Sequence, residues 1–204
     1  MNYITKLCAD DLRTFISNNY SIKLKATHAH ELVAAFFGYK TNAALLADTN
    51  TPISNLPQAH VVILAPSESI DERRKRLHDL PLELPDTQVL GEIIFTTLSN
   101  KGLLSKPWPT YEHFAKFLAD ECLREKKMDK IYRNPVGEGV SVKDGDDHKQ
   151  LIVSRFYQQL ITNSATFMVN EFQITTFIKL PLVAGRIGYN RPEFSMKIEN
   201  LGTR

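Results

Sequence analysis

The stretch from Lys23 to Asp48 constrains the fold most strongly, because it specifies two helices and the turn that joins them. Leu32 and Phe36 recur with other apolar residues at helical spacing, which gives the first helix a stripe that must be buried. Gly38 follows where a left-handed residue often ends a helix, and Tyr39 is placed to pack back on that helix. The segment therefore predicts a compact pair of short helices.

The ends of these two helices carry polar residues suited to capping. Thr27 is expected to cap the first helix, and Thr41 or Asn42 the second. The spacing also matches a helix-turn-helix, but a DNA-recognition helix needs several Arg, Lys, Asn or Gln side chains. Asn42 offers one such side chain among alanines and leucines. We therefore expect a packing module that docks on an amphipathic helix at residues 4–16.

The composition is that of an ordinary globular protein, since 43% of the 204 residues are hydrophobic and 24% are charged. A net charge of +2 and a pI near 8.5 are too mild to indicate nucleic acid or an anionic membrane as a partner. Cys8 and Cys122 are expected to be reduced thiols. The N-terminal segment lacks a signal-peptide pattern, and no apolar run approaches the ~20 residues of a transmembrane helix. We therefore expect a soluble cytoplasmic protein with no membrane partner.

Further helices and one strand are predicted in the first 130 residues. Apolar residues at helical spacing, bounded by capping residues, prolines or glycines, predict helices at residues 2–18, 68–80, 86–99 and 111–127. A continuous apolar run predicts a buried strand at residues 60–65. The segment around Trp108 is expected to be a stiff, proline-bearing linker.

The C-terminal part has the pattern of an antiparallel sheet. From residue 150 onwards β-branched and aromatic residues dominate and in places alternate with polar ones, as in residues 194–198. Asp144-Gly145 and Asn163-Ser164 are candidate hairpin turns. The sequence therefore predicts an α+β protein, mainly helical at first and then a sheet. The expected segments are a helical module at 1–50, a mostly helical part with one strand at 51–130, and the sheet at 131–204. A single domain made of 51–130 and 131–204 together is the alternative.

Histidine and acidic residues gather in two places, and neither predicts a metal site. His28 and His30 point in different directions on a helix, while His28 and Glu31 share a face but supply only two ligands. His28 is expected to cap the helix or to lie in solvent. The acidic residues 144–148 have their glycine misplaced for a calcium loop, so a solvated hairpin tip is expected. No nucleophile, phosphate-loop or dinucleotide motif is present, and neither a metal nor a cofactor is predicted.

Two basic groups are the candidates for binding nucleic acid. The first is Arg73, Arg74, Lys75 and Arg76, and the second is Arg124, Lys126, Lys127, Lys130 and Arg133. Clustered cations attract phosphates because counterions are released on binding. Acidic residues are interleaved with both groups, so an ion-paired, solvated helix face is the competing interpretation.

Residues 26–47 resemble a helical segment of known proteins. The pattern consists of His28, the run Glu-Leu-Val-Ala at 31–34, the run Gly-Tyr-Lys-Thr at 38–41, and Leu45. It is similar to a module of uncharacterised bacterial proteins, some of which are labelled glyoxalase-related. These proteins often carry tryptophan after the turn, where this chain has Asn42. The resemblance covers a small part of the chain and implies a bacterial accessory protein, without the metal set that glyoxalase activity needs.

Three functional hypotheses remain, in order of preference. The first is a non-enzymatic binding or regulatory protein that acts through protein–protein contacts. The second is a nucleic-acid-binding protein that uses the two basic groups, assisted by aromatic side chains of the sheet. The third is an enzyme with a dispersed site, whose candidate residues lie in turn-rich segments: Asp144, Asp146, His148 and Tyr189.

Overall fold

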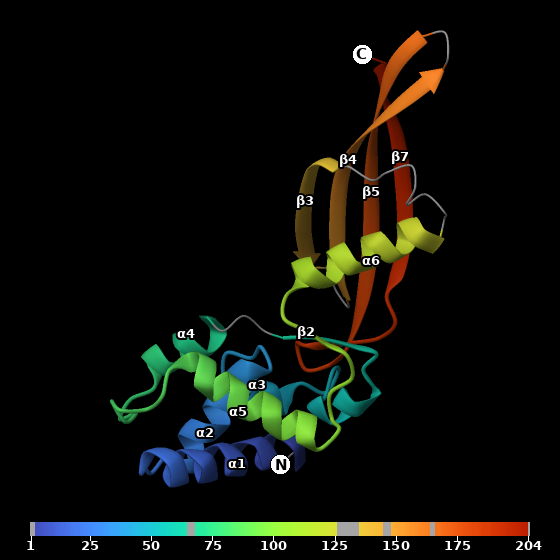
Figure 1. Ribbon diagram of the computed structural model, residues 1–204. Coiled ribbons are helices and arrows are strands. Elements are labelled where there is room, and N and C mark those ends of the chain that lie inside the picture. Colours follow the sequence, from blue (N-terminus) through green and yellow to red (C-terminus); the bar gives the residue numbers. More distant parts are fainter. Residues whose placement is uncertain (1–2, 65–67, 126–134, 145–147, 164–165, 204) are drawn as a thin grey trace. The chain divides into compact units, whose positions relative to one another are not determined.

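The computed structural model describes residues 3–64, 68–125, 135–144, 148–163 and 166–203 (Figure 1). Within these ranges it contains seven helical segments and a mixed sheet of seven strands, with helices mostly N-terminal and strands mostly C-terminal. The predicted α+β class is therefore confirmed. The chain forms two compact units: unit 1 comprises Met1–Thr110 and Leu182–Arg191, and unit 2 comprises Tyr111–Pro181 and Pro192–Arg204. These units divide the chain at other points than the expected limits at residues 50 and 130.

Unit 1 is built mainly from helices. They are α1 (Tyr3–Tyr20), α2 (Ala26–Phe36), α3 (Asn42–Ala47), the 3-10 helix η1 (Ile53–Gln58), α4 (Glu68–Arg76) and α5 (Thr87–Asn100). The α-helices agree with the predicted positions, although α4 ends four residues before the expected limit at residue 80. No helix is predicted for the proline-bearing segment that forms η1, because a short 3-10 helix leaves little periodicity in a sequence.

The helices α1 and α2 pack together and provide much of the core of unit 1. Leu12 and Ile16 of α1 and Leu32 and Val33 of α2 are fully buried in one apolar cluster. The cluster also contains side chains of α5, of the end of β5 and of the turn after it: Leu90, Ile94, Leu98, Ala184 and Ile187. The prediction that the helical pair docks on the first helix is confirmed for α2, which packs directly on α1.

The turn between α2 and α3 has the predicted form. Gly38 has a φ of +83°, and the Tyr39 amide donates a hydrogen bond of 2.9 Å to the Ala34 carbonyl. The side chain of Thr41 caps α3 by accepting a hydrogen bond from the Ala44 amide at 3.0 Å. Local turn chemistry therefore determines how the two helices are joined.

Two predictions about the start of α2 are wrong. The helix begins at Ala26, and Lys25 before it makes no side-chain capping hydrogen bond, so Thr27 lies within the first turn and does not cap the helix. His28 is buried rather than solvated. His28 is buried because both α1 and α4 pack against α2.

Three short strands belong to unit 1. They are β1 (Val61–Ile63), β2 (Pro107–Trp108) and β6 (Gly188–Tyr189). β1 pairs in parallel with β2 and antiparallel with β6, and β6 also pairs with the last residues of β5. The buried strand predicted at residues 60–65 is confirmed at its centre. The expected linker around Trp108 forms β2 instead, where a proline is tolerated because an edge strand needs fewer amide donors.

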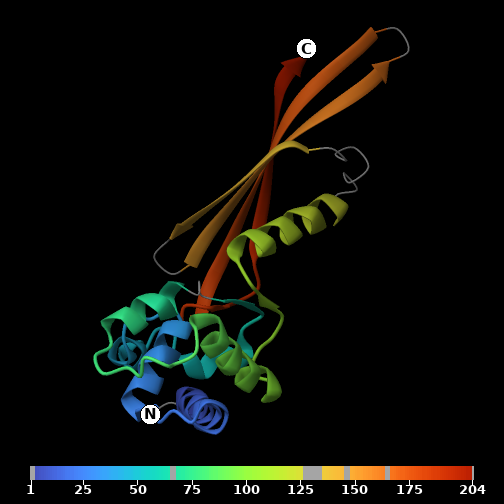
Figure 2. The ribbon, with the colours of Figure 1, turned by 60° about the vertical axis from the view of Figure 1, so that its left-hand side comes forward.

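Unit 2 consists of one helix on an antiparallel sheet. Its elements are α6 (Tyr111–Glu125), β3 (Pro135–Asp144), β4 (His148–Asn163), β5 (Thr166–Ala184, whose last residues belong to unit 1) and β7 (Glu193–Thr203). The strand order is β3-β4-β5-β7, and all neighbours are antiparallel. Figure 2 shows that β4 and β5 continue as a two-stranded ribbon beyond their pairing with β3 and β7.

Both predicted hairpins are present, and their strands are longer than expected. The pairs Asp144–Lys149 and Asn163–Thr166 are the last before the two turns, whose residues lie outside the described ranges. β5 continues as a single strand of 19 residues. Residues 135–139 have no strand pattern in the sequence, but they belong to β3 because their backbone pairs with β4.

One face of the sheet carries a cross-strand row of apolar residues. The row consists of Val142, Leu151, Ile178 and Phe194, one from each strand in the order β3, β4, β5 and β7. The two central members are fully buried, whereas Val142 and Phe194 are exposed. The row is thus buried on the two central strands and exposed on the two outer strands.

The helix α6 covers this face (Figure 1) and is held by both apolar and ionic contacts. Ile174 packs against Leu123 of α6. Arg155 of β4 forms ion pairs with Asp120 of α6 and with Glu138 of β3, whose Oε1 lies 3.0 Å from an Arg155 nitrogen. The Arg155 side chain is therefore a bridge between the helix and two strands.

Candidate functional site

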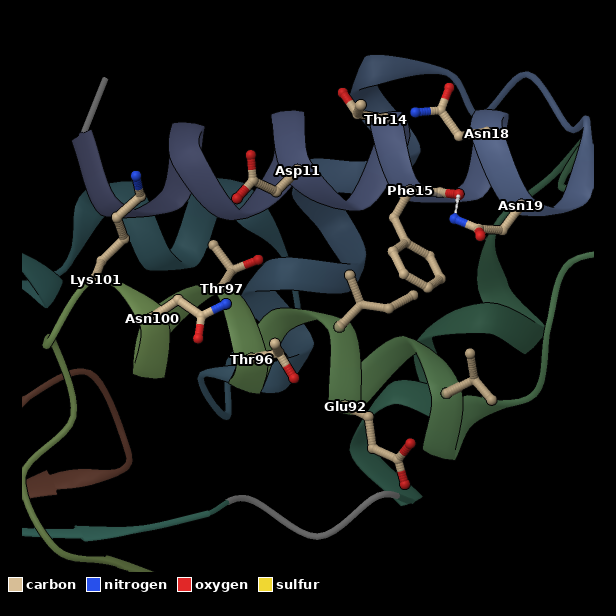
Figure 3. Close-up of a pocket in the computed structure, with 12 residues that line it drawn as sticks. Asp11, Thr14, Phe15, Asn18, Asn19, Glu92, Thr96, Thr97, Asn100 and Lys101 are labelled. Atoms are coloured by element: carbon tan, nitrogen blue, oxygen red, sulfur yellow. Dashed lines mark hydrogen bonds between the residues drawn. The ribbon is translucent and has the colours of Figure 1, made fainter.

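A groove of about 590 Å³ lies on unit 1 between α1 and α5 (Figure 3). Each helix contributes residues three and four positions apart, which share one face of a helix. The lining residues are Asp11, Thr14, Phe15, Asn18 and Asn19 on α1, and Val89, Glu92, Ile93, Thr96, Thr97, Asn100 and Lys101 on or just after α5. The groove is therefore built on two regular helices rather than on loops.

The floor of the groove is apolar and includes an exposed aromatic ring. Phe15 is 42% exposed, and Figure 3 shows its ring pointing from α1 toward α5. Ile93 is buried at the α5 side. Phe15 recurs at helical spacing with the apolar residues of α1, which predicts that it belongs to their buried stripe, and this prediction is wrong. The buried stripe is formed by Leu12 and Ile16, and Phe15 lies at its border, where α5 covers it only in part.

The walls of the groove are polar, with an excess of negative charge. The Thr14 hydroxyl and the Asn19 amide each donate a 2.9 Å hydrogen bond to a carbonyl one turn earlier on α1. Asp11 and Glu92 place a carboxylate on each wall, and Lys101 supplies one cation at the end of α5. An apolar floor between hydrogen-bonding walls suits a ligand that is itself amphipathic.

The first basic group lies on α4, and its four cations have different surroundings. Arg73 Nη2 is 2.8 Å from Glu31 Oε2, and the two side chains are only 17% and 21% exposed. Arg74 donates a 3.2 Å hydrogen bond to a backbone carbonyl ahead of α5. Lys75 and Arg76 are exposed. Two of the four predicted nucleic-acid-binding side chains are therefore engaged within the protein.

The second basic group belongs to the other unit and is described only in part. Arg124 lies on α6, where its Nη2 is 2.9 Å from Glu121 Oε1. The rest of this group lies outside the described residues: Lys126, Lys127, Lys130 and Arg133. The structure thus places the first group in unit 1 and Arg124 in unit 2.

A smaller pocket of about 170 Å³ lies on unit 1 between the α2–α3 turn and α4. Its lining residues are Gly38, Tyr39, Lys40, Ser69, Glu72, Arg73 and Arg76. In the sequence the arginines form one basic run, and nothing connects them with Lys40. The available signal is a lysine two residues after a helix-ending glycine, but nothing local shows that α4 faces this turn.

The wall formed by Tyr39 is fixed by Asp48. The Tyr39 hydroxyl donates a 2.7 Å hydrogen bond to Asp48 Oδ2, and burial together with this bond raises the pKa of Tyr39 to about 12. Burial also acts to raise the pKa of Asp48, but hydrogen bonds from Thr51 and Tyr39 outweigh it and leave that pKa below its usual value. Tyr39 therefore stays neutral and Asp48 charged at neutral pH, as suits a structural contact.

The residues considered for an enzyme site are not brought together by the described structure. Tyr189 is fully buried, and its hydroxyl donates to the Arg186 carbonyl at 3.1 Å, so it is a core residue of β6. Asp144 ends β3 and His148 begins β4, with side chains outside the described ranges, and Asp146 lies outside them entirely.

Other reactive groups are buried or dispersed. Burial is the main reason why the pKa of the Cys8 thiol is raised to about 12, which disfavours the nucleophilic thiolate, and Cys122 is also buried. Among the described residues no three His, Cys, Asp or Glu side chains gather in a way that suits a metal ion. In the same ranges, no helix combines the length and apolar character needed to cross a membrane.

Comparison with known proteins returns no relative: no family model, no curated protein and no solved structure matches the chain.

Proposed function

We propose that the protein is a non-enzymatic binding protein that holds a short amphipathic helix of a protein partner in the groove between α1 and α5. The observation that carries this proposal is the exposed Phe15 ring over an apolar floor between two polar walls. Aromatic side chains that are partly exposed in a groove are typical anchors of protein interfaces. Regular helices on both sides give the groove a preformed shape, which lowers the entropic cost of binding.

The length of the groove supports a helical occupant. Its α5 wall runs from Val89 to Lys101, which corresponds to about 18 Å at 1.5 Å per residue. A partner helix of about three turns covers the same distance and presents an apolar stripe on one face. The groove volume of about 590 Å³ falls within the ~300–1,000 Å³ that is usual for ligand sites.

The charges on the walls favour a basic occupant. Asp11 and Glu92 lie on opposite walls, so lysine or arginine residues on either side of the apolar stripe can meet a carboxylate. Charges at the rim of an interface mainly set orientation and association rate. The affinity is expected to come from apolar contact with Phe15 and Ile93.

A designed peptide tests this proposal directly. The probe is a fluorescent helical peptide of about 14 residues, with leucines spaced by three and four positions and lysines beside them, and binding is followed by anisotropy. Phe15→Ala should weaken binding by roughly tenfold, because truncating an aromatic anchor costs more than ~1 kcal/mol. Phe117→Ala is the matched control, since Phe117 lies on α6 and is also 42% exposed. The proposal fails if the wild-type protein does not bind, or if both variants lose the same affinity.

Nucleic-acid binding through the basic groups is the alternative proposal. It is supported by Lys75 and Arg76, which are exposed on α4, but Arg73 and Arg74 already have partners within the protein. Filter binding of single-stranded DNA across salt concentrations tests it. Phosphate contacts require an affinity that falls steeply with salt, so salt-independent binding would exclude this alternative.

A further inference from the structure

We infer that the pocket between the α2–α3 turn and α4 is a binding site for a doubly charged phosphate group, either free or at the end of a small ligand. The pocket shares no lining residue with the α1–α5 groove, so the inference is independent of the proposed function. It gives the basic residues of α4 a specific role instead of a diffuse one.

The face of α4 that lines the pocket is suited to an anion. Ser69, Arg73 and Arg76 are spaced by four and three residues, so they lie on one face of the helix. Lys40 faces them from the turn, and Glu72 is the one carboxylate in the lining. The lining therefore has three cations against one anion, together with a serine hydroxyl that can donate a hydrogen bond.

Arg73 is held in place before any ligand binds. Its Nη2 is 2.8 Å from Glu31 Oε2, and the same oxygen accepts the Asn42 amide at 2.9 Å. The Nε atom of Arg73 is buried and therefore closed to a ligand. A guanidinium has five N–H donors, however, so the contact of Nη2 with Glu31 does not use all of them. A fixed guanidinium with donors to spare is well prepared to bind an oxyanion.

The opposite wall is equally constrained. Gly38 has a φ of +83°, and a Cβ atom on it would lie 2.6 Å from the Cβ of Arg186. Tyr39 is fixed by its hydrogen bond to Asp48 and by Arg186, whose Cζ lies 5.5 Å from the Tyr39 ring centroid. Lys40 therefore directly follows two residues that are held in place.

The size of the pocket limits what it can hold. Its volume of about 170 Å³ is well below the ~300–1,000 Å³ that is usual for sites of drug-sized ligands. A tetrahedral phosphate with a few waters fits this space, but a nucleoside does not, so any organic part of the ligand must extend into solvent.

The charge of the pocket favours a phosphate monoester over a phosphodiester. Three cations and one carboxylate leave two net positive charges in the lining, and Glu31 behind Arg73 offsets part of this excess. A terminal phosphate carries about −1.5 to −2 at neutral pH, whereas each phosphate of a nucleic-acid backbone carries one charge. The chemistry of the site therefore matches a small phosphorylated ligand better than a nucleic-acid strand.

Calorimetric titration of the full chain with inorganic phosphate, against chloride at equal ionic strength, tests the inference. The wild-type protein should bind phosphate saturably, and Lys40→Gln and Arg76→Gln should each weaken binding at least roughly fivefold, because each removes a charge-assisted hydrogen bond. Lys75→Gln is the matched control: it removes the same charge from α4, but Lys75 does not line the pocket, so affinity should change less than twofold. The binding of the groove peptide should be unchanged in all three variants.

Three results would overturn the inference. They are the absence of saturable phosphate binding, an equal loss in Lys75→Gln and Arg76→Gln, and tighter binding of an oligothymidylate without terminal phosphate than of inorganic phosphate. A second titration with glycerol phosphate and adenosine monophosphate distinguishes the sources of the phosphate group. Tighter binding of either ester assigns the pocket to an organic monoester, and equal affinities assign it to the free ion.

Discussion

Glu31 and Arg73 form an ion pair that is largely shielded from solvent, with 2.8 Å between Oε2 of the first and Nη2 of the second. The same carboxylate oxygen accepts the backbone amide of Asn42, the first residue of α3. One carboxylate therefore joins α2, α3 and α4. Glu31, which the sequence suggests as part of an incomplete metal site, is a structural residue.

The Glu31→Gln variant should lower the free energy of unfolding by about 2 kcal/mol, because it leaves the charge of Arg73 without its counter-ion in a shielded position. Urea denaturation at neutral pH measures the change. Glu72→Gln is the control, since Glu72 is 70% exposed and 4.0 Å from Arg76, and it should cost less than about 0.5 kcal/mol. Similar losses in the two variants would show that the Glu31 pair contributes no more than a surface pair.

Gly38→Ala should destabilise the protein by more than the usual cost of a left-handed residue. The φ of +83° alone costs an alanine ~1–2 kcal/mol, and the new Cβ would also lie 2.6 Å from Arg186 Cβ. Gly102→Ala separates the two effects, because Gly102 has a φ of +64° with no atom within 4 Å of an added Cβ. In thermal unfolding, Gly38→Ala should have a lower melting temperature than Gly102→Ala. Equal melting temperatures would refute the steric argument.

The Tyr39–Asp48 hydrogen bond should stabilise the fold over a limited range of pH. The folded-state pKa of Asp48 is lowered, so its contribution is present above the unfolded pKa of about 3.9 and is lost as the pH falls through the folded pKa. The pKa of Tyr39 is raised to about 12, so its contribution is complete below ~10 and is lost as the pH rises toward the folded pKa.

The difference in unfolding free energy between the wild type and Tyr39→Phe should therefore be largest from about pH 5 to 9 and shrink on either side. Urea denaturation across this range measures it. Tyr20→Phe, which changes an exposed tyrosine, should differ from the wild type by a small amount that does not vary with pH in this way. If the difference in unfolding free energy between the wild type and Tyr39→Phe did not change with pH, the proposed pH dependence would be contradicted.

The parts of the fold that could be predicted are those determined by local chemistry. The helical stripes, the left-handed Gly38 and the two hairpin turns each depend on residues close together in the chain, and the α+β class follows from them. His28 and Trp108 are exceptions for a common reason. Packing of α1 and α4 around α2, and pairing of β1 with β2, override the local preference of each residue.

The candidate sites could not be predicted, because they depend on which helices become neighbours. In the sequence Phe15 has the spacing of a core residue. In the structure α5 covers its ring only in part, so the ring is partly exposed. The four cations of α4 look equivalent in sequence. In the structure, Arg73 pairs with Glu31, and Arg74 donates a hydrogen bond to a distant carbonyl. Arg73 and Arg76 line a pocket together with Lys40.

The row Val142, Leu151, Ile178 and Phe194 shows how the position of a strand in a sheet governs contact with water. The central strands β4 and β5 each have a neighbouring strand on both sides, whereas β3 and β7 have one on a single side only. Leu151 and Ile178 are therefore flanked by row members on both sides and are fully buried, and Val142 and Phe194, although also hydrophobic, each have one open flank and are exposed. Place in the strand order, and not side-chain polarity, decides which of these four residues meets water.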